Sequence, residues 1–74
     1  MTTHTFALTT EYIELDKLLK LLSIASSGGA AKAMIADGLV TVDGEVELRK
    51  TRKLRAGSTV RVAGETIEVT GGAR

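Results

Sequence analysis

The chain has 74 residues, of which 43% are hydrophobic and 26% charged, with a net charge of +1 at pH 7 and no cysteine. This length allows one small hydrophobic core, the apolar share excludes a disordered chain, and the lack of cysteine excludes disulfide stabilisation. No apolar run approaches the roughly 20 residues of a membrane-spanning helix and no signal peptide is recognisable, so we expect one cytoplasmic domain over residues 1–74, with a disordered tail at 71–74.

The first third of the chain predicts a short strand followed by a helix. Residues 5–10 alternate weakly between apolar and polar side chains, as an edge strand does. The spacing i, i+3, i+4 and i+7, typical of one apolar helix face, is shown by four leucines, Leu15, Leu18, Leu19 and Leu22. Leu21 lies outside this face, which predicts that the helix is covered on more than one side.

A second helix is predicted at residues 30–36. Ser26 or Ser27 can cap its N-terminus, because a hydroxyl oxygen accepts a hydrogen bond from a free backbone amide. Gly38 ends the helix, since glycine readily adopts the left-handed conformation. The short connection at residues 23–26 favours a helical hairpin.

Beyond the second helix the hydrophobic period changes from 3.6 to 2, which predicts strands. A two-residue turn at residues 43–44 would place Glu45 and Glu47 on the apolar face of the first hairpin. We therefore expect a three-residue connection or a bulge, with these acids on the exposed side of the strand. The expected pairs are Val42 with Val46 and Val40 with Leu48.

A second hairpin is predicted near the C-terminus, with a two-residue turn at residues 64–65, where a first glycine suits a type II′ turn. The expected pairs are Val62 with Ile67 and Val60 with Val69. The order of elements then indicates an α+β domain. We expect a two-helix hairpin packed on a small antiparallel β-sheet, with an extra N-terminal edge strand.

The near-neutral net charge hides a basic cluster between the two hairpins. Half of the ten basic residues fall within seven positions without an acid among them, at Arg49, Lys50, Arg52, Lys53 and Arg55. Such a cluster attracts polyanions whatever the total charge. A solvated loop is the alternative interpretation of the same run.

The residues give little support for an enzyme or a metal site. The chain has one histidine, His4, and Ser27 has no base at a recognisable spacing. The segment at residues 27–29 lacks the preceding strand and the third glycine of a dinucleotide fingerprint. Dispersed carboxylates without cysteine or histidine make a poor metal site. We expect no catalysis, no metal and no cofactor.

Residues 13–62 carry an ordered set of segments that resembles a known family. The segments are Leu15-Asp16-Lys17-Leu18-Leu19, then Ser27 with Ala31 and Lys32, then Gly38-Leu39-Val40-Thr41-Val42-Asp43-Gly44, and finally Gly57-Ser58 before Val60. They resemble the RNA-binding domain named after ribosomal protein S4, and most of all its small stand-alone bacterial members. Glu14 and Gly28 depart from the pattern, because the family usually has arginine at both positions.

The resemblance implies RNA binding, and structured RNA such as rRNA, a ribosomal particle or a tRNA-like molecule as the partner of a monomer. The expected phosphate contacts are Lys17, Lys32, Arg49, Lys50, Arg52, Lys53 and Arg55. Ser27, Gly28 and Gly29 could hold a further phosphate at a helix start, although close packing of this turn is the explanation we favour. Tyr12 and Phe6 are the only aromatic residues, which argues against a stacking platform for single strands.

Two alternatives remain open on the sequence. The basic cluster could dock an acidic protein, which would make the chain a protein–protein interaction domain. An anion- or nucleotide-binding domain would need a pocket that this length hardly allows. Charge alone does not separate RNA from DNA, whereas the salt dependence of binding separates a nucleic acid from a protein partner.

Overall fold

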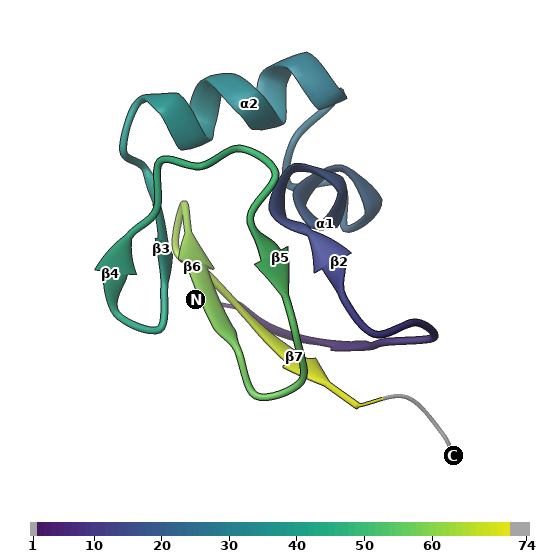
Figure 1. Cartoon of the computed structure of the whole chain (residues 1–74). Helices are drawn as coiled ribbons and strands as arrows, with labels where there is room; N and C mark the ends of the chain where they lie inside the picture. Colours follow the sequence, from purple (N-terminus) through teal and green to yellow (C-terminus); the bar gives the residue numbers. More distant parts are fainter. Residues whose placement is uncertain (1, 72–74) are drawn as a thin grey trace.

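Both helices lie on the same face of a five-stranded sheet, with a separate two-stranded sheet beside the first helix (Figure 1). The computed structural model describes residues 2–71, so positions 72–74 of the expected tail lie outside the described residues. The elements are β1 Thr2–Ala7, β2 Ile13–Glu14, α1 Leu15–Leu21, α2 Gly28–Ala36, β3 Val40–Val42, β4 Glu45–Val46, β5 Lys53–Leu54, β6 Thr59–Val62 and β7 Glu65–Thr70. The expected α+β class is confirmed.

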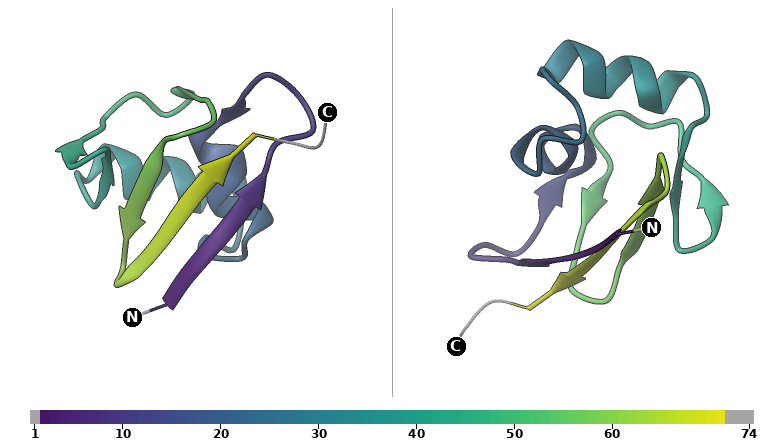
Figure 2. Two further views of the ribbon diagram at one scale, coloured as in Figure 1. Left: turned by 90° about the horizontal axis from the view of Figure 1, so that it is seen from below. Right: turned by 180° about the vertical axis from the view of Figure 1, so that it is seen from behind.

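The large sheet has the strand order β1-β7-β6-β3-β4, and β2 pairs with β5 in the small one. β1 runs parallel to β7, whereas the other neighbours are antiparallel, so the sheet is mixed rather than wholly antiparallel. Figure 2 shows β6, β7 and β1 side by side with the helices behind them. The N-terminal edge strand was expected at residues 5–10 but lies at 2–7. It pairs with β7 up to Ala7, and the next residue, Leu8, is buried in the core.

The helices contribute their apolar faces to one core. Leu15, Leu18 and Leu19 of α1 are fully buried, but the side of α1 that carries Leu21 is open, with Leu21 63% exposed. The expectation that α1 is covered on more than one side is therefore wrong. α2 begins at Gly28, two residues earlier than expected, and Ser27 caps it as predicted, with its Oγ accepting from the Ala30 amide at 3.0 Å. No described helix is long and apolar enough to cross a membrane.

The first hairpin has a tighter turn than the sequence predicted. Val42 pairs with Glu45, which leaves only Asp43 and Gly44 in the turn, both with positive φ, at 52° and 87°. The Glu47 amide then donates to the Val40 carbonyl at 3.0 Å, so Glu47 lies on the buried side. The burial of an acid is the reason why this register was not expected. Its cost is offset by arginine partners of Glu47 that the strand pattern does not reveal. The predicted pairs of Val42 with Val46 and of Val40 with Leu48 are wrong, because Val46 pairs with Thr41, and Val46 and Leu48 are exposed.

The second hairpin also turns one residue earlier than predicted. Val62 pairs with Glu65, which places the two-residue turn at Ala63 and Gly64, with φ of 52° and 78°. Positive φ at both positions matches a type I′ turn, whose twist fits that of the flanking strands. The partners of Val60 and Val62 were therefore predicted wrongly. The buried face was predicted correctly, because moving a pairing by two residues leaves every side chain on its original face.

Candidate nucleic-acid interface

The basic segment, residues 49–55, is fixed to the N-terminus of α1 through its backbone. The Leu15 amide donates to the Arg52 carbonyl at 2.9 Å, and the Asp16 amide donates to the Lys50 carbonyl at 3.1 Å. The first amides of a helix have no partner within the helix, and here the basic segment supplies two. Figure 1 shows the segment leading from β4 toward the start of α1 and into β5. Its backbone is thereby held, while the side chains of Lys50, Lys53 and Arg55 are exposed.

Glu47 connects this segment to the sheet. Its side chain is only 8% exposed, and its carboxylate accepts from Arg49 Nε at 3.0 Å, from Arg49 Nη2 at 3.1 Å and from Arg52 Nη1 at 2.7 Å. The Arg49 amide donates a further bond at 2.9 Å. The hydrogen bonds from Arg49, aided by Arg52, outweigh the effect of burial and lower the pKa of Glu47 from 4.5 to about 2. Glu47 was expected on the exposed side of a strand, and that expectation is wrong.

The five basic residues of the segment therefore fall into two groups. Arg49 and Arg52 share Glu47, although the Arg49 side chain is still 73% exposed, and the carboxylate raises the pKa of Arg49. Lys50, Lys53 and Arg55 are exposed and form no ion pair with a carboxylate within residues 2–71. These three side chains make up the uncompensated positive charge of the segment.

The pairing of β2 with β5 brings Tyr12 beside two of these cations. Ile13 pairs with the buried Leu54, so the side chains at the alternate positions point to the other face of this two-stranded sheet. On that face Lys53 Nζ lies 5.1 Å from the Tyr12 ring centroid, and Arg55 Cζ lies 5.6 Å from it. Both distances are within the range of a cation–π interaction. Sequence reasoning missed this arrangement, since two-residue strands show no periodicity.

Lys17 joins this part of the surface, whereas Lys32 does not. Lys17 Nζ lies 3.4 Å from Glu14 Oε1, and Glu14 itself pairs with Lys53 across the small sheet. Glu14 thus places a negative charge among the cations at a position where the family usually has arginine. Lys32 is exposed on α2, and no hydrogen bond or ion pair links its side chain to the basic segment within residues 2–71.

The start of α2 is more open than we expected. The Ser27 hydroxyl is engaged as the cap, while the amides of Gly28 and Gly29 have no hydrogen-bond partner among the described residues. A Cβ built on Gly28 meets nothing within 4 Å, and one on Gly29 meets only Ser27 Oγ at 3.8 Å. Close packing therefore does not explain these glycines, and that preference was wrong.

Residues 6–70 match the family model of the S4 domain, which is nearly the whole described chain. The chain belongs to the S4 domain family. The resemblance predicted from the sequence is thus confirmed, and the S4 domain extends to the strands at both ends, beyond the expected 13–62. No group of three or more histidine, cysteine or acidic side chains placed to hold a metal ion occurs among residues 2–71.

Two bacterial relatives share most of this S4 domain. YbcJ of Escherichia coli strain K12 is 50% identical over 58 residues, which cover 78% of this chain and 83% of YbcJ. The "Probable ribosome maturation protein RlbA" of Bacillus subtilis strain 168 is 40% identical over 55 residues, or 74% of this chain and 78% of RlbA.

The solution structure of E. coli YbcJ has the same fold. It superposes with a TM-score of 0.69 at 48% identity and covers 89% of this chain and 85% of that one. That structure is described as revealing an alfaL motif involved in RNA-binding.

Proposed function

We propose that this S4-domain protein is a non-catalytic module that binds structured RNA and contacts its phosphates through the basic segment. The observation that carries the proposal is the set of exposed, uncompensated cations Lys50, Lys53 and Arg55 on a backbone fixed by the α1 N-terminus. The likeness to YbcJ, whose structure is described with an RNA-binding motif, supports the same function.

Phosphate recognition suits both the geometry and the residue types. Arginine donates two parallel bonds to a phosphate, lysine acts as a point charge, and each phosphate that is neutralised releases counterions. A-form RNA hides its base edges in a deep groove, so cations on a backbone that is held in place would recognise the shape of the RNA and the spacing of its phosphates. Lys17 and the exposed side of Arg49 add to these cations, and Arg52 lies beside them. Lys32 with Ser27, Gly28 and Gly29 offers a separate phosphate contact on α2.

We propose rRNA, or a ribosomal particle that displays it, as the source of that RNA, with tRNA-like molecules as the other candidate. The relative RlbA is named for ribosome maturation, which favours the ribosomal source. A monomer of this size presents one basic segment and so contacts one RNA site.

The test is a salt series of binding measurements on purified protein, with a structured rRNA hairpin, a matched single strand and a duplex DNA. The variant replaces Lys50, Lys53 and Arg55 with glutamine and leaves the Glu47 pairs intact. The control replaces Lys20 and Arg61, two exposed cations outside the segment, with glutamine. Circular dichroism checks that both variants fold.

We expect tightest binding to the hairpin, with log affinity falling linearly against log salt concentration. The slope should drop by about 2 to 3 in the triple variant, because each phosphate that is no longer neutralised reduces it by about 0.7 to 0.9. It should remain unchanged in the control. Absence of hairpin binding at low salt by the folded protein would refute the proposal. It would favour instead an acidic protein as the ligand of the segment.

A further inference from the structure

Tyr12 is the one aromatic side chain that borders the cations of the proposed RNA site. It is half-buried immediately before β2, and its backbone carbonyl accepts a 2.8 Å bond from Thr10 Oγ1. Lys53 and Arg55 lie over the ring at 5.1 and 5.6 Å. This ring and the two cations beside it supply the two properties that bind a nucleotide, an aromatic face for the base and positive charge for the phosphate.

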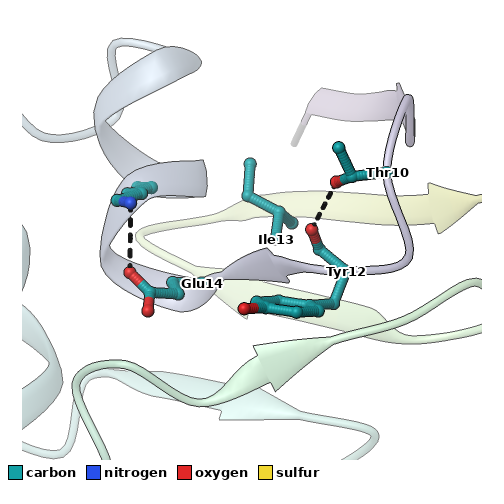
Figure 3. A pocket seen from close by; sticks show the side chains of 5 residues that line it. Thr10, Tyr12, Ile13 and Glu14 are labelled. Carbon is teal, nitrogen blue, oxygen red and sulfur yellow. Dashed lines mark hydrogen bonds and ion pairs between the residues drawn. The ribbon is translucent and has the colours of Figure 1, made fainter.

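A shallow pocket of about 360 Å³ opens beside this ring. Figure 3 shows Tyr12 and Glu14 in its lining, and Lys17, which pairs with Glu14, also lines it. Thr10 and Ile13 complete the wall. The volume lies at the small end of the range of ligand sites, enough for one nucleotide and too small for a run of stacked bases.

We propose that this pocket receives a single unpaired nucleotide of the bound RNA, with the base stacked on Tyr12 and its phosphates near Lys17, Lys53 and Arg55. The inference rests on the proposed RNA binding and narrows its target to structured RNA with a bulged, looped or terminal base. Sequence-selective proteins commonly recognise RNA where bases are unstacked and can lie on an aromatic side chain. One ring accommodates one base, which agrees with the scarcity of aromatic residues elsewhere in the chain.

The competing explanation is that Tyr12 only packs against the stems of Lys53 and Arg55 and contacts no RNA. The two explanations differ in whether the environment of the Tyr12 ring changes when RNA binds. The chain has one tyrosine and no tryptophan, so the intrinsic tyrosine fluorescence of the intact protein comes from Tyr12 alone.

The experiment titrates the protein with two RNAs of equal length, a perfect duplex and the same duplex with one bulged nucleotide. Free N-acetyltyrosinamide corrects for absorption by the RNA. We expect the bulged RNA to quench Tyr12 emission and the duplex to leave it nearly unchanged. In parallel, Tyr12→Leu should weaken binding of the bulged RNA by about 5- to 150-fold without changing duplex affinity, while Tyr12→Phe should retain the affinity of the original protein.

Equal emission with both RNAs, together with unchanged affinity in Tyr12→Leu, would overturn the inference and leave salt-dependent RNA binding standing. Equal loss in Tyr12→Phe and Tyr12→Leu would also overturn it, because the hydroxyl and not the ring face would then be the determinant. Failure of the unaltered protein to bind either RNA would refute the proposed function itself. The fluorescence result stands even where Tyr12→Leu does not fold.

Discussion

Glu47 Oε1 accepts a 2.7 Å bond from Arg52 Nη1, which ties a buried carboxylate beside the sheet to the middle of the basic segment. Arg49 binds the same carboxylate through two guanidinium nitrogens and its own amide. The segment is therefore attached on two sides, to Glu47 by side chains and to α1 by backbone bonds. A segment whose backbone is already held in place loses less conformational entropy when it binds RNA than a flexible loop would.

Replacing Glu47 with glutamine should lower the free energy of unfolding by about 1.5 to 3 kcal/mol at pH 7, as expected for hydrogen bonds to a charged group. The pKa of Glu47 is lowered from 4.5 to about 2 in the folded protein. The unfolded chain therefore binds more protons between these values, so this stabilisation is complete above pH 4.5 and disappears as the pH falls toward 2. Urea unfolding across this range measures the difference.

The matched control for that experiment is Glu45→Gln, an exposed acid two residues earlier without an ion pair within residues 2–71. It should change stability by less than about 0.5 kcal/mol at any pH. A difference between the original protein and Glu47→Gln that stays constant from pH 6 to pH 2 would contradict the role assigned to the carboxylate.

Replacing Glu14 with glutamine should strengthen RNA binding by about two- to fivefold at low salt. Glu14 pairs with Lys17 at 3.4 Å and sits opposite Lys53, so it repels phosphate where the proposed site attracts it. The gain should shrink as salt rises, because exposed charges are screened. Glu68→Gln, an exposed acid on the open face of the sheet, serves as control and should leave affinity unaltered. Weaker binding by Glu14→Gln would place the phosphates elsewhere.

Replacing Ala63 with asparagine should stabilise the protein by about 1 kcal/mol, because asparagine tolerates the left-handed conformation better than alanine does. Ala63 has φ of 52° in the turn between β6 and β7. Gly64→Ala, at φ of 78°, should destabilise it by a similar amount. Thermal unfolding of both variants checks the turn. If the turn were at residues 64–65 instead, position 63 would be a strand residue and asparagine there would destabilise.

Replacing Gly28 with alanine should raise the free energy of unfolding by about 0.4 to 1 kcal/mol, since it removes conformational freedom from the unfolded chain. Gly28 lies in the first turn of α2, its φ is not positive, and an added Cβ meets nothing within 4 Å. The same substitution at Gly44, with φ of 87°, should be destabilising. Denaturant unfolding of the two variants should thus give opposite signs, and loss of stability in Gly28→Ala would show that α2 starts differently.

The local features of this protein were determined by the sequence. The leucine spacing of α1, the serine cap of α2 and the buried valines of β3, β6 and β7 are all visible in it, because each depends on the period of one element or on its immediate neighbours. The period-2 pattern failed at Val46, which is exposed. The ordered segments of the S4 domain were likewise sufficient to predict the family. The basic segment was visible as a run of charge.

The pairing between elements was decided by the tertiary structure. A period-2 pattern fixes which face a side chain occupies but leaves the register free by two residues, so the partner of Val60 was predicted wrongly while its burial was right. The burial of Glu47 depends on Arg52, a partner five residues away that no strand pattern contains. Tyr12 reaches Lys53 and Arg55 only because two-residue strands from distant parts of the chain pair, and pairing at that range follows from packing of the whole core rather than from local periodicity.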